Sequence, residues 1–493
     1  MTKRIAIIGA GFAGLSAAAK CAQLGYETHV FEKHSTPGGR CRAFNHNGFL
    51  FDMGPSWYWM PEVFEEFFAE YGEKRADYYE LERLDPSYRV FFNSHEFDVP
   101  ANTNLLGQKL EEIEPGAANN LKQFLREAEI KYETGMGEFV HKPSHSIFEF
   151  FQFKIVKALF QLHLFTPISK HIRKFFKHPE IIQLLEFPVL FLGAKPNKTP
   201  ALYSLMNYAD IELGTWYPKG GMVEIPLAME KVAVKQGAQF HYNSDVKKII
   251  TQEGKVTGIQ VGNENINFDA VIAAGDYHHI ESKLLNLEDQ SYSQSYWESR
   301  TMSPSSLLFY LAIDKEIPGL LHHNLFFDHS FDKHAEEIYD NPQWPSKPLF
   351  YACVPSKTDK RVAPEGKENI FLLVPVAPDM TSDENLREEY LKMLIERLEK
   401  RTGVAIQDHI IYKRSFAHEE FISEYNSFKG NAYGLANTLM QTAFLKPKLR
   451  SKKLANLFFA GQLTVPGPGV PPSIISGKLA ANTIHQTYFS KRS

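Results

Sequence analysis

Residues 4–23 read RIAIIGAGFAGLSAAAKCAQ: an apolar run, a glycine-rich turn and an alanine-rich stretch in immediate succession. Gly9, Gly11 and Gly14 match the G-x-G-x-x-G pattern that joins a buried strand to a helix in dinucleotide-binding folds. The first glycine permits a tight turn, the second lets the backbone approach a pyrophosphate, and the third lets the helix pack on the strand. The pattern therefore predicts a strand, a phosphate-binding turn and a helix running to about Leu24.

An acidic residue ends the next apolar run. In THVFEK (28–33), Glu32 lies 18 residues beyond Gly14. A carboxylate at this place accepts hydrogen bonds from ribose hydroxyls and repels a 2′-phosphate. The basic start and small residues of the N-terminal stretch also resemble a secretory signal. The glycine spacing and Glu32 favour the nucleotide-binding fold instead.

A second glycine loop follows. GGRCR (38–42) begins six residues after Glu32, and FDMGPSWYWM (51–60) comes next. Gly38 and Gly39 would let the backbone lie against a cofactor, and Arg40 would bring positive charge to its phosphates. A nicotinamide enzyme needs no such second loop. This order of motifs resembles the FAD-binding half of the flavin amine oxidase and carotenoid desaturase superfamily.

The other end of the chain fits the same superfamily. NLFFAG (456–461) predicts a buried strand, and Pro472 onward predicts a helix with proline tolerated in its first turn. The resemblance implies that this helix points its N-terminus at the flavin pyrimidine ring, where its dipole would stabilise negative charge. Residues 461–471 contain no titratable side chain, so the redox chemistry is left to the flavin.

The resemblance also places a middle segment beside the cofactor, with Val246 meeting the adenine through its backbone and Asp276 following a nearby strand. We therefore expect an α/β fold: a discontinuous, Rossmann-like FAD domain, a mixed α+β substrate domain and a helical, membrane-contacting subdomain. The FAD domain is expected over 1–90, 215–290 and 450–493, and the substrate domain over 91–214 and 291–449, including a basic-apolar helical segment over 145–200.

The expected cofactor site consists mainly of backbone segments. The residues predicted to bind FAD are Gly9, Gly11, Phe12, Ala13, Gly14, Glu32, Lys33, Gly38, Gly39, Arg40, Gly54, Pro55, Ser56, Val246, Asp276, Gly461, Gly469, Val470 and Pro471. No catalytic side chain is identified. No metal site is predicted, because the pairs His278-His279 and His322-His323 lack the spacing of known metal motifs.

Three longer segments, at 51–72, 178–222 and 430–477, are similar to the bacterial phytoene desaturase family, and the resemblance covers essentially the whole chain. The family's T-H-P-G-x-G run here has Val465 in place of its histidine, so any catalytic role of that histidine does not carry over. The resemblance implies FAD-dependent dehydrogenation of phytoene towards lycopene. The substrate would be a C40 polyene taken from the lipid phase, and oxygen or a membrane quinone would accept the electrons.

Other activities share these motifs: a 3,4-desaturase, a carotene isomerase or a ketolase-like oxidase. An amine oxidase would need an aromatic cage. A non-enzymatic prenyl-lipid carrier is a further alternative, because the GDP-dissociation inhibitors use this fold without flavin. The complete glycine pattern and GGR argue against loss of FAD.

Residues 151–179 contain five lysines, one arginine and no acidic residue, whereas the whole chain has a net charge of −4. Lys154, Lys157 and Gln161 fall on one helical face. The pattern suits a helix lying in an anionic membrane surface, or a substrate-domain helix whose lysine stems cover core. A water-insoluble substrate favours the membrane.

The bulk composition narrows the function classes further. A sequence pI near 6.6 argues against a nucleic-acid partner. Three cysteines cannot form a disulfide framework. From the cysteine usage we expect a cytoplasmic protein, and from the basic segment we expect it to attach to the inner face of the cell membrane. It is not expected to cross the membrane, because no apolar run reaches the ~20 residues of a spanning helix.

Residues 381–403 predict an amphipathic helix with a Ser/Asp cap and a terminal glycine.

Overall fold

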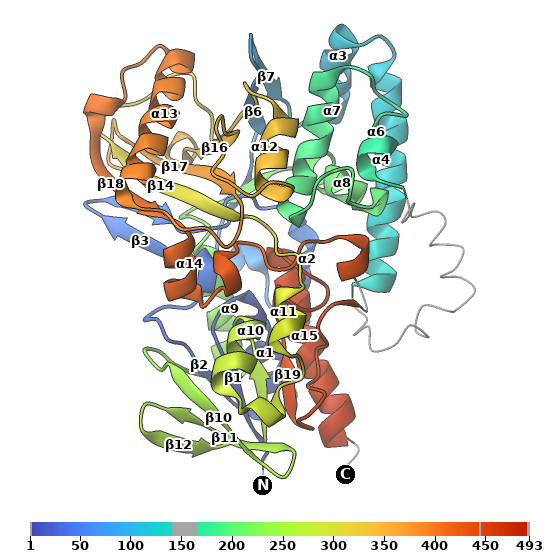
Figure 1. Cartoon of the computed structure of the whole chain (residues 1–493), viewed down its shortest axis with the longest axis vertical. Coiled ribbons are helices and arrows are strands. Elements are labelled where there is room, and N and C mark those ends of the chain that lie inside the picture. The colour runs from blue at the N-terminus through green and yellow to red at the C-terminus, as the bar shows by residue number, and fades with distance from the viewer. Residues whose placement is uncertain (1, 141–165, 443–444, 491–493) are drawn as a thin grey trace.

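The computed structural model describes residues 2–140, 166–442 and 445–490. In Figure 1 its lower half is built on a parallel sheet, and its upper half on a larger mixed sheet flanked by helices. This arrangement is the α/β fold predicted from the sequence.

The parallel sheet draws strands from both ends of the chain. Its order is β19 (Leu457–Phe459), β13 (Ala270–Ala273), β1 (Arg4–Ile8), β2 (Glu27–Phe31) and β9 (Gln239–His241). Alternate residues of β1 enter different cores: Ile5 and Ile7 pack against the helices, whereas Ala6 and Ile8 face the other side. Both faces are therefore buried, as parallel sheets require.

Helices cover one face and an antiparallel meander covers the other, so the sheet is the middle layer of three. The helical layer comprises α1 (Phe12–Gln23), α9 (Glu224–Lys235) and α15 (Val470–Ile484), with α2 (Pro61–Glu70) beside them. The opposite layer comprises β10 (Val246–Gln252), β11 (Lys255–Val261) and β12 (Glu264–Asn267), with α10 (Tyr277–His279) and α11 (Gln294–Glu298). The strand and helix predicted around the first glycine turn are confirmed. The last helix begins two residues earlier than predicted, with two prolines in its first turn.

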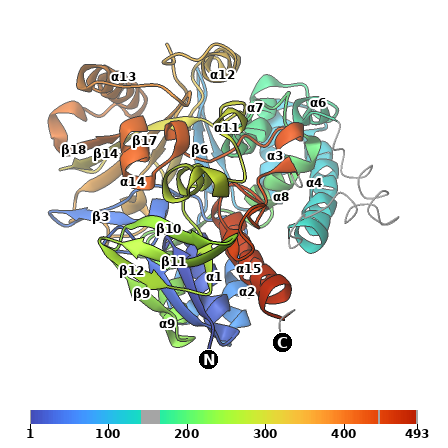
Figure 2. The ribbon, with the colours of Figure 1, turned by 60° about the horizontal axis from the view of Figure 1, so that its bottom comes forward.

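α1 and α15 lie side by side in Figure 2 and touch backbone to backbone. A Cβ atom added at Gly477 of α15 would lie 2.0 Å from the Ala13 carbonyl oxygen of α1. Within α1 itself, a Cβ atom at Gly14 would lie 1.9 Å from the carbonyl oxygen of Gly9 in the preceding turn. Ser16 Oγ also donates a hydrogen bond of 2.7 Å to the Ile474 carbonyl. The first and last helices of the chain are thus locked together.

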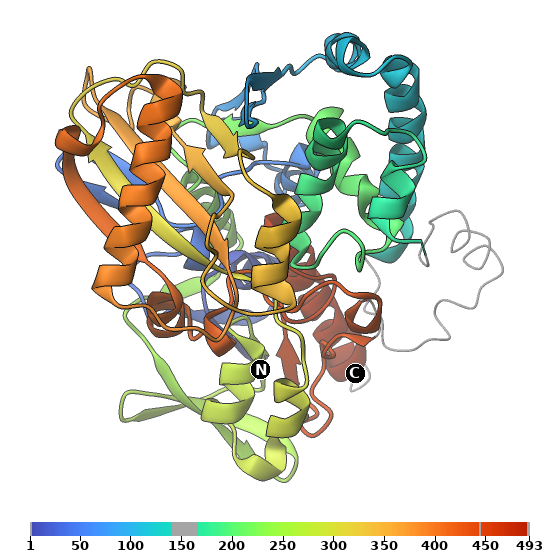
Figure 3. The ribbon, with the colours of Figure 1, turned by 45° about the horizontal axis from the view of Figure 1, so that its top comes forward.

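The upper half contains a mixed sheet with one face covered by α13 (Glu384–Thr402), the long helix crossing the strands in Figure 3. Asp383 caps α13 by accepting a hydrogen bond of 2.8 Å from the Leu386 amide, and Gly403 ends it with a φ of 70°. The predicted amphipathic helix is confirmed at both ends. The strand order is β18 (Ile410–Phe416), β14 (Ser305–Ile313), β17 (Glu368–Val376), β16 (Phe350–Cys353), β15 (His323–Phe326), β6 (Tyr88–Phe91) and β7 (Glu96–Val99).

Several helices and a short hairpin pack around the other face of the mixed sheet. The helices are α3 (Thr103–Ile113), α4 (Ala117–Thr134), α6 (Ile168–Ile172), α7 (Pro179–Glu186), α8 (Leu205–Ile211) and α12 (Phe331–Tyr339). The hairpin is β3 (Ala43–His46) with β4 (Phe49–Asp52). A further short pair, β5 (Leu81–Arg83) with β8 (Trp216–Pro218), packs Leu81 and Trp216 against the core beneath the parallel sheet's helices. The predicted face of Lys154, Lys157 and Gln161 lies outside the described residues. Within those residues, no helix combines the length and apolar character that crossing a membrane requires.

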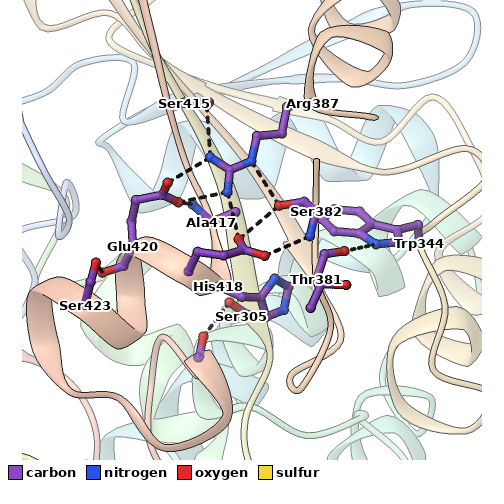
Figure 4. Close-up of polar contacts among 12 residues, drawn as sticks. Ser305, Trp344, Thr381, Ser382, Arg387, Ser415, Ala417, His418, Glu420 and Ser423 are labelled. Atoms are coloured by element: carbon purple, nitrogen blue, oxygen red, sulfur yellow. Dashed lines mark hydrogen bonds and ion pairs between the residues drawn. The ribbon is translucent and has the colours of Figure 1, made fainter. Parts of the chain in front are cut away.

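A polar network ties α13 to α14 (His418–Tyr425), as Figure 4 shows. The Arg387 guanidinium donates to Glu419 at 2.7 Å and to Glu420 at 3.0 Å. Glu420 also accepts a hydrogen bond of 2.7 Å from the Ala417 amide, which fixes the start of α14. The network therefore positions α14, whose last residues line the cavity described next.

Candidate functional site

A cavity of about 980 Å³ lies between the parallel sheet and the mixed sheet. It begins at the carboxyl ends of β1 and β2 and extends to α8 and α12 in the upper half. Every residue predicted to bind the cofactor lines this cavity except Gly14. Gly14 lies beneath the turn, where only hydrogen fits against the Gly9 carbonyl.

The first glycine turn leaves room for a ligand. Gly11 precedes α1 with φ −73° and ψ 179°, and a Cβ atom built on it would meet no atom within 4 Å. The first turn of α1 carries no acidic side chain, and Gly11 supplies no side-chain acceptor to its amides. Open space in front of a positive helix end fits a pyrophosphate.

Glu32 is buried at the end of β2, and its carboxylate is held by the backbone. Its oxygens accept hydrogen bonds of 2.8 Å from the Ala10 amide and 3.0 Å from the His34 amide. A carboxylate has further lone pairs and can still accept from ribose hydroxyls. The neighbouring Lys33 donates to the Ser423 carbonyl at 2.8 Å, towards α14, and burial lowers its pKa.

The second glycine loop lies directly on the first. The Gly38 amide donates to the Ala10 carbonyl at 2.8 Å, and a Cβ atom on Gly39 would lie 3.3 Å from Gly11 Cα. Gly54 packs still more closely on this loop, because its Cβ atom would lie 2.3 Å from the Arg40 carbonyl oxygen. These three glycines bring separate chain segments to one edge of the cavity.

Arg40 places a half-buried positive charge at this edge. Its guanidinium lies over the Tyr425 ring at 5.2 Å and contacts the Ser427 hydroxyl, while its Nε finds no hydrogen-bond partner among the described residues. Burial lowers the pKa of Arg40, and Asp276 opposes that shift. Burial raises the pKa of Asp276 to about 6. A phosphate oxygen would give Arg40 Nε an acceptor, which fits the predicted role.

The C-terminal loop closes the same end of the cavity. The Gly461 amide donates to Ser476 Oγ at 3.0 Å, so the loop after β19 is fixed to α15. Gly467 and Gly469 adopt φ values of 145° and 112°, which side chains rarely tolerate. Residues 465–473 line the cavity, and the N-terminus of α15 is among them.

The far end of the cavity is apolar. Its lining includes Trp57, Met136, Val140, Phe187, Leu205, Met206, Leu308, Phe327 and Phe371. His334 also lines it, but both of its ring nitrogens are within hydrogen-bond distance of backbone groups, and burial lowers its pKa to about 4. Met440 is 70% exposed and lines the same cavity, so the apolar end reaches the surface beside it. The space suits a long hydrocarbon.

Lys446 is a residue near the site that the sequence motifs did not single out. It is 2% exposed, its Nζ donates to Asn437 Oδ1 at 2.9 Å, and it lies 3.5 Å from the place of a Cβ on Gly467. Burial lowers its pKa to about 7. Its position 20 residues before Pro466 gives no sequence signal for this contact.

Lys446→Met is expected to change how stability depends on pH. The folded pKa of about 7 lies below the ordinary lysine value of about 10.4. Between these two pH values, the Lys446 amine is protonated in the unfolded chain and neutral in the folded protein. The free energy of unfolding therefore increases as pH rises, by up to about 1.4 kcal/mol per pH unit. The variant should lose this rise in urea unfolding measured from pH 7 to 9.5, whereas the exposed control Lys452→Met should keep it. Parallel curves for Lys446→Met and wild type would contradict the assignment.

Comparison with known proteins identifies the relatives of this arrangement. The model of the flavin containing amine oxidoreductase family matches residues 12–485. A carotenoid 3,4-desaturase from Haloarcula japonica is 37% identical over 482 residues, covering 97% of each chain. A zeta-carotene-forming phytoene desaturase from Myxococcus xanthus is 32% identical over 489 residues, covering 98% of this chain and 94% of the relative.

Solved structures share the fold at low sequence identity. An oxidoreductase from Methanosarcina mazei has a TM-score of 0.63 at 16% identity and covers 96% of this chain and 99% of its own. Putrescine oxidase bound to putrescine has a TM-score of 0.60 at 11% identity, with 99% of both chains covered. Both likenesses concern the fold alone.

Proposed function

Because the chain belongs to the flavin-containing amine oxidoreductase family, whose model covers residues 12–485, we propose that it desaturates an acyclic C40 polyene, taking phytoene towards lycopene. The protein is an FAD-dependent oxidoreductase related over its whole length to carotenoid desaturases. The observation that carries the proposal is the single cavity that joins the glycine turns to a long apolar space.

The residues at the polar end would hold the cofactor. Gly11 and the N-terminus of α1 would bind its pyrophosphate, Glu32 its ribose, and the Val246 backbone its adenine. The first turn of α15 would lie against the ring system. Bound FAD supplies a hydride acceptor at N5.

The chain's own contribution to the reaction is positioning and exclusion of water. Apolar walls would align two neighbouring C–H bonds of the polyene and leave one straight path for the chain. Val465 occupies the family's histidine position, and residues 461–471 contain no titratable side chain. We therefore assign no acid or base, and we propose oxygen or a quinone as the final electron acceptor.

A second candidate is 3,4-desaturation of an already conjugated carotenoid, favoured by the 37% identity to the Haloarcula japonica enzyme. Both reactions remove two hydrogens from adjacent carbons, so the same cavity could serve either. They differ in the substrate that enters.

Expression in two carotenoid-producing hosts tests these candidates. In a host that accumulates phytoene, the first proposal predicts coloured products with longer conjugation in pigment extracts. In a host that accumulates lycopene, 3,4-desaturation predicts a further red shift. Colour change only in the lycopene host would replace the first proposal, and no change in either host, with flavin-loaded protein present, would contradict both.

We propose further that the protein attaches to the cytoplasmic membrane surface through the basic segment, of which residues 166–179 are described. Lys170, Lys174 and Lys177 are exposed there, whereas Arg173 pairs with Glu186. Exposed basic residues near the surface of an anionic membrane each contribute roughly 1 kcal/mol.

Reversing those three lysines to glutamate should weaken partitioning onto anionic liposomes by roughly 100-fold or more. The matched control reverses the exposed Lys247, Lys248 and Lys255 of the meander, which carry the same charge elsewhere. Equal loss of sedimentation in both variants would show a general charge effect, and unchanged sedimentation of the first would refute the attachment site.

A further inference from the structure

A second cluster of buried polar side chains lies where β15 and β16 pair. His323 is directly opposite Cys353 in the antiparallel register, and His322 immediately precedes β15. One ring nitrogen of each histidine and Cys353 Sγ all lie within 4.8 Å of one another. None of the three residues is more than 5% exposed. Donors of these types at this separation form the nucleus of a metal site.

In each of the two imidazole rings, one nitrogen lies within hydrogen-bond distance of a hydroxyl group and the other has no partner among the described residues. His322 Nδ1 lies 2.8 Å from Thr358 Oγ1, and His323 Nδ1 lies 2.6 Å from the Tyr351 hydroxyl. The Nε2 atom of each ring has no hydrogen-bond partner among the described residues. If Nδ1 donates to its hydroxyl partner, Nε2 carries a lone pair, which is how outer partners prepare metal-ligating histidines. Buried ring nitrogens without partners, in a cluster of three metal-ligating residue types, indicate that a ligand belongs at this place.

A small cavity opens at this place. Its volume is about 20 Å³, and His322, Cys353, Tyr217 and Asp52 are among its lining residues. The Tyr217 hydroxyl also lacks a partner among the described residues. The Asp52 carboxylate is fixed by the Met222 amide at 2.8 Å and the Val223 amide at 3.1 Å. The space admits one ion or one water.

We propose that His322, His323 and Cys353 bind one Zn²⁺ ion at the edge of this cavity, which His322 and Cys353 line and His323 adjoins. Two imidazoles and a thiolate are the donor set that zinc prefers, with a fourth position left for water or a nearby oxygen. Donor atoms in tetrahedral zinc sites lie about 3.3–3.8 Å apart, so binding would shorten the distances between the three donor atoms by up to about 1.5 Å. The Cys353 S–H bond breaks as the S–Zn bond forms, and its proton leaves to solvent. No oxidation or reduction is involved.

The site would stiffen a wall of the main cavity. The Trp57 ring stacks on His323 with 4.1 Å between ring centroids, and the Tyr351 hydroxyl donates to Ser56 Oγ at 3.0 Å. Ser56 and Trp57 both line the main cavity. A metal that fixes His323 would therefore fix the segment at the junction of the polar and apolar ends. The inference does not depend on which polyene the protein takes.

Metal analysis of the flavin-loaded protein tests the proposal. After incubation with zinc sulfate and dialysis against metal-free buffer, we expect about one zinc per chain by mass spectrometry. Crystals of the same protein should give an anomalous peak at the zinc edge between the three side chains. Less than about a tenth of an equivalent, or density for a water with no anomalous signal, would overturn the proposal.

Substitutions locate the metal on the chain. Cys353→Ser and His322→Gln should each lower the zinc content at least about tenfold, whereas His278→Gln, a histidine outside the cluster, should leave it unchanged. Flavin content and melting temperature identify variants that fold. The anomalous peak of the wild type decides the matter if neither cluster variant folds. Zinc retained in folded Cys353→Ser would also overturn the assignment.

Discussion

A Gly11→Val variant is expected to fold and to purify without FAD. The residue already has an extended conformation that valine accepts, and its Cβ atom would meet no protein atom within 4 Å. The valine methyl groups would instead fill the space in front of α1, where the pyrophosphate is expected to lie. We expect flavin per chain to fall from about one to below about a tenth, measured by absorbance after denaturation.

The control for this variant is Gly137→Val. Gly137 also has open space around its Cβ position, but it does not line the cavity. Both variants replace glycine with valine. If only Gly11→Val loses flavin, the loss is caused by valine in the glycine turn and not by a general effect of the substitution on folding. Stoichiometric FAD in folded Gly11→Val would show that the pyrophosphate lies elsewhere.

Gly477→Ala is expected to destabilise the whole protein, although the same change usually favours a helix. Alanine gains up to about 1 kcal/mol over glycine in a helix interior. Here its Cβ would lie 2.0 Å from the Ala13 carbonyl oxygen and 2.9 Å from the Ala17 amide nitrogen. Backbone atoms cannot move aside individually, so α1 and α15 must separate, at a cost of about 3 kcal/mol or more.

The expected result is a lower melting temperature and a partial loss of FAD, because α1 and α15 also carry the two helix N-termini of the site. Lys478→Ala, on the next residue of the same helix, is the matched control and should change the melting temperature little. If Gly477→Ala melted at or above the wild-type temperature, the close helix contact would be wrong.

Local motifs made much of the fold predictable. The first strand, turn and helix followed from glycine spacing, and α13 followed from its Asp383 cap and terminal Gly403. These features depend on backbone conformations that only a few residue types adopt. These conformations can therefore be predicted from the local sequence, without knowledge of the rest of the molecule.

Contacts between distant segments could not be predicted in the same way. His322 and His323 lack metal spacing along the chain, and only the pairing of β15 with β16 sets Cys353 opposite His323 and close to His322. The perturbed Lys446 likewise depends on burial behind the Gly467 loop, which no local pattern encodes. Strand register and burial are properties of the whole fold, so these groups appear only in three dimensions.

The parallel sheet that carries the glycine turn also determines when folding can be completed during translation. β1 leaves the ribosome early, but β19 and α15 are made some 450 residues later; at about 5–20 residues per second this delay is tens of seconds. Until then one sheet edge and the α15 face of α1 have no partner. The nascent chain must therefore keep the parallel sheet incomplete while the strands of the mixed sheet, made before β19, are already available to fold.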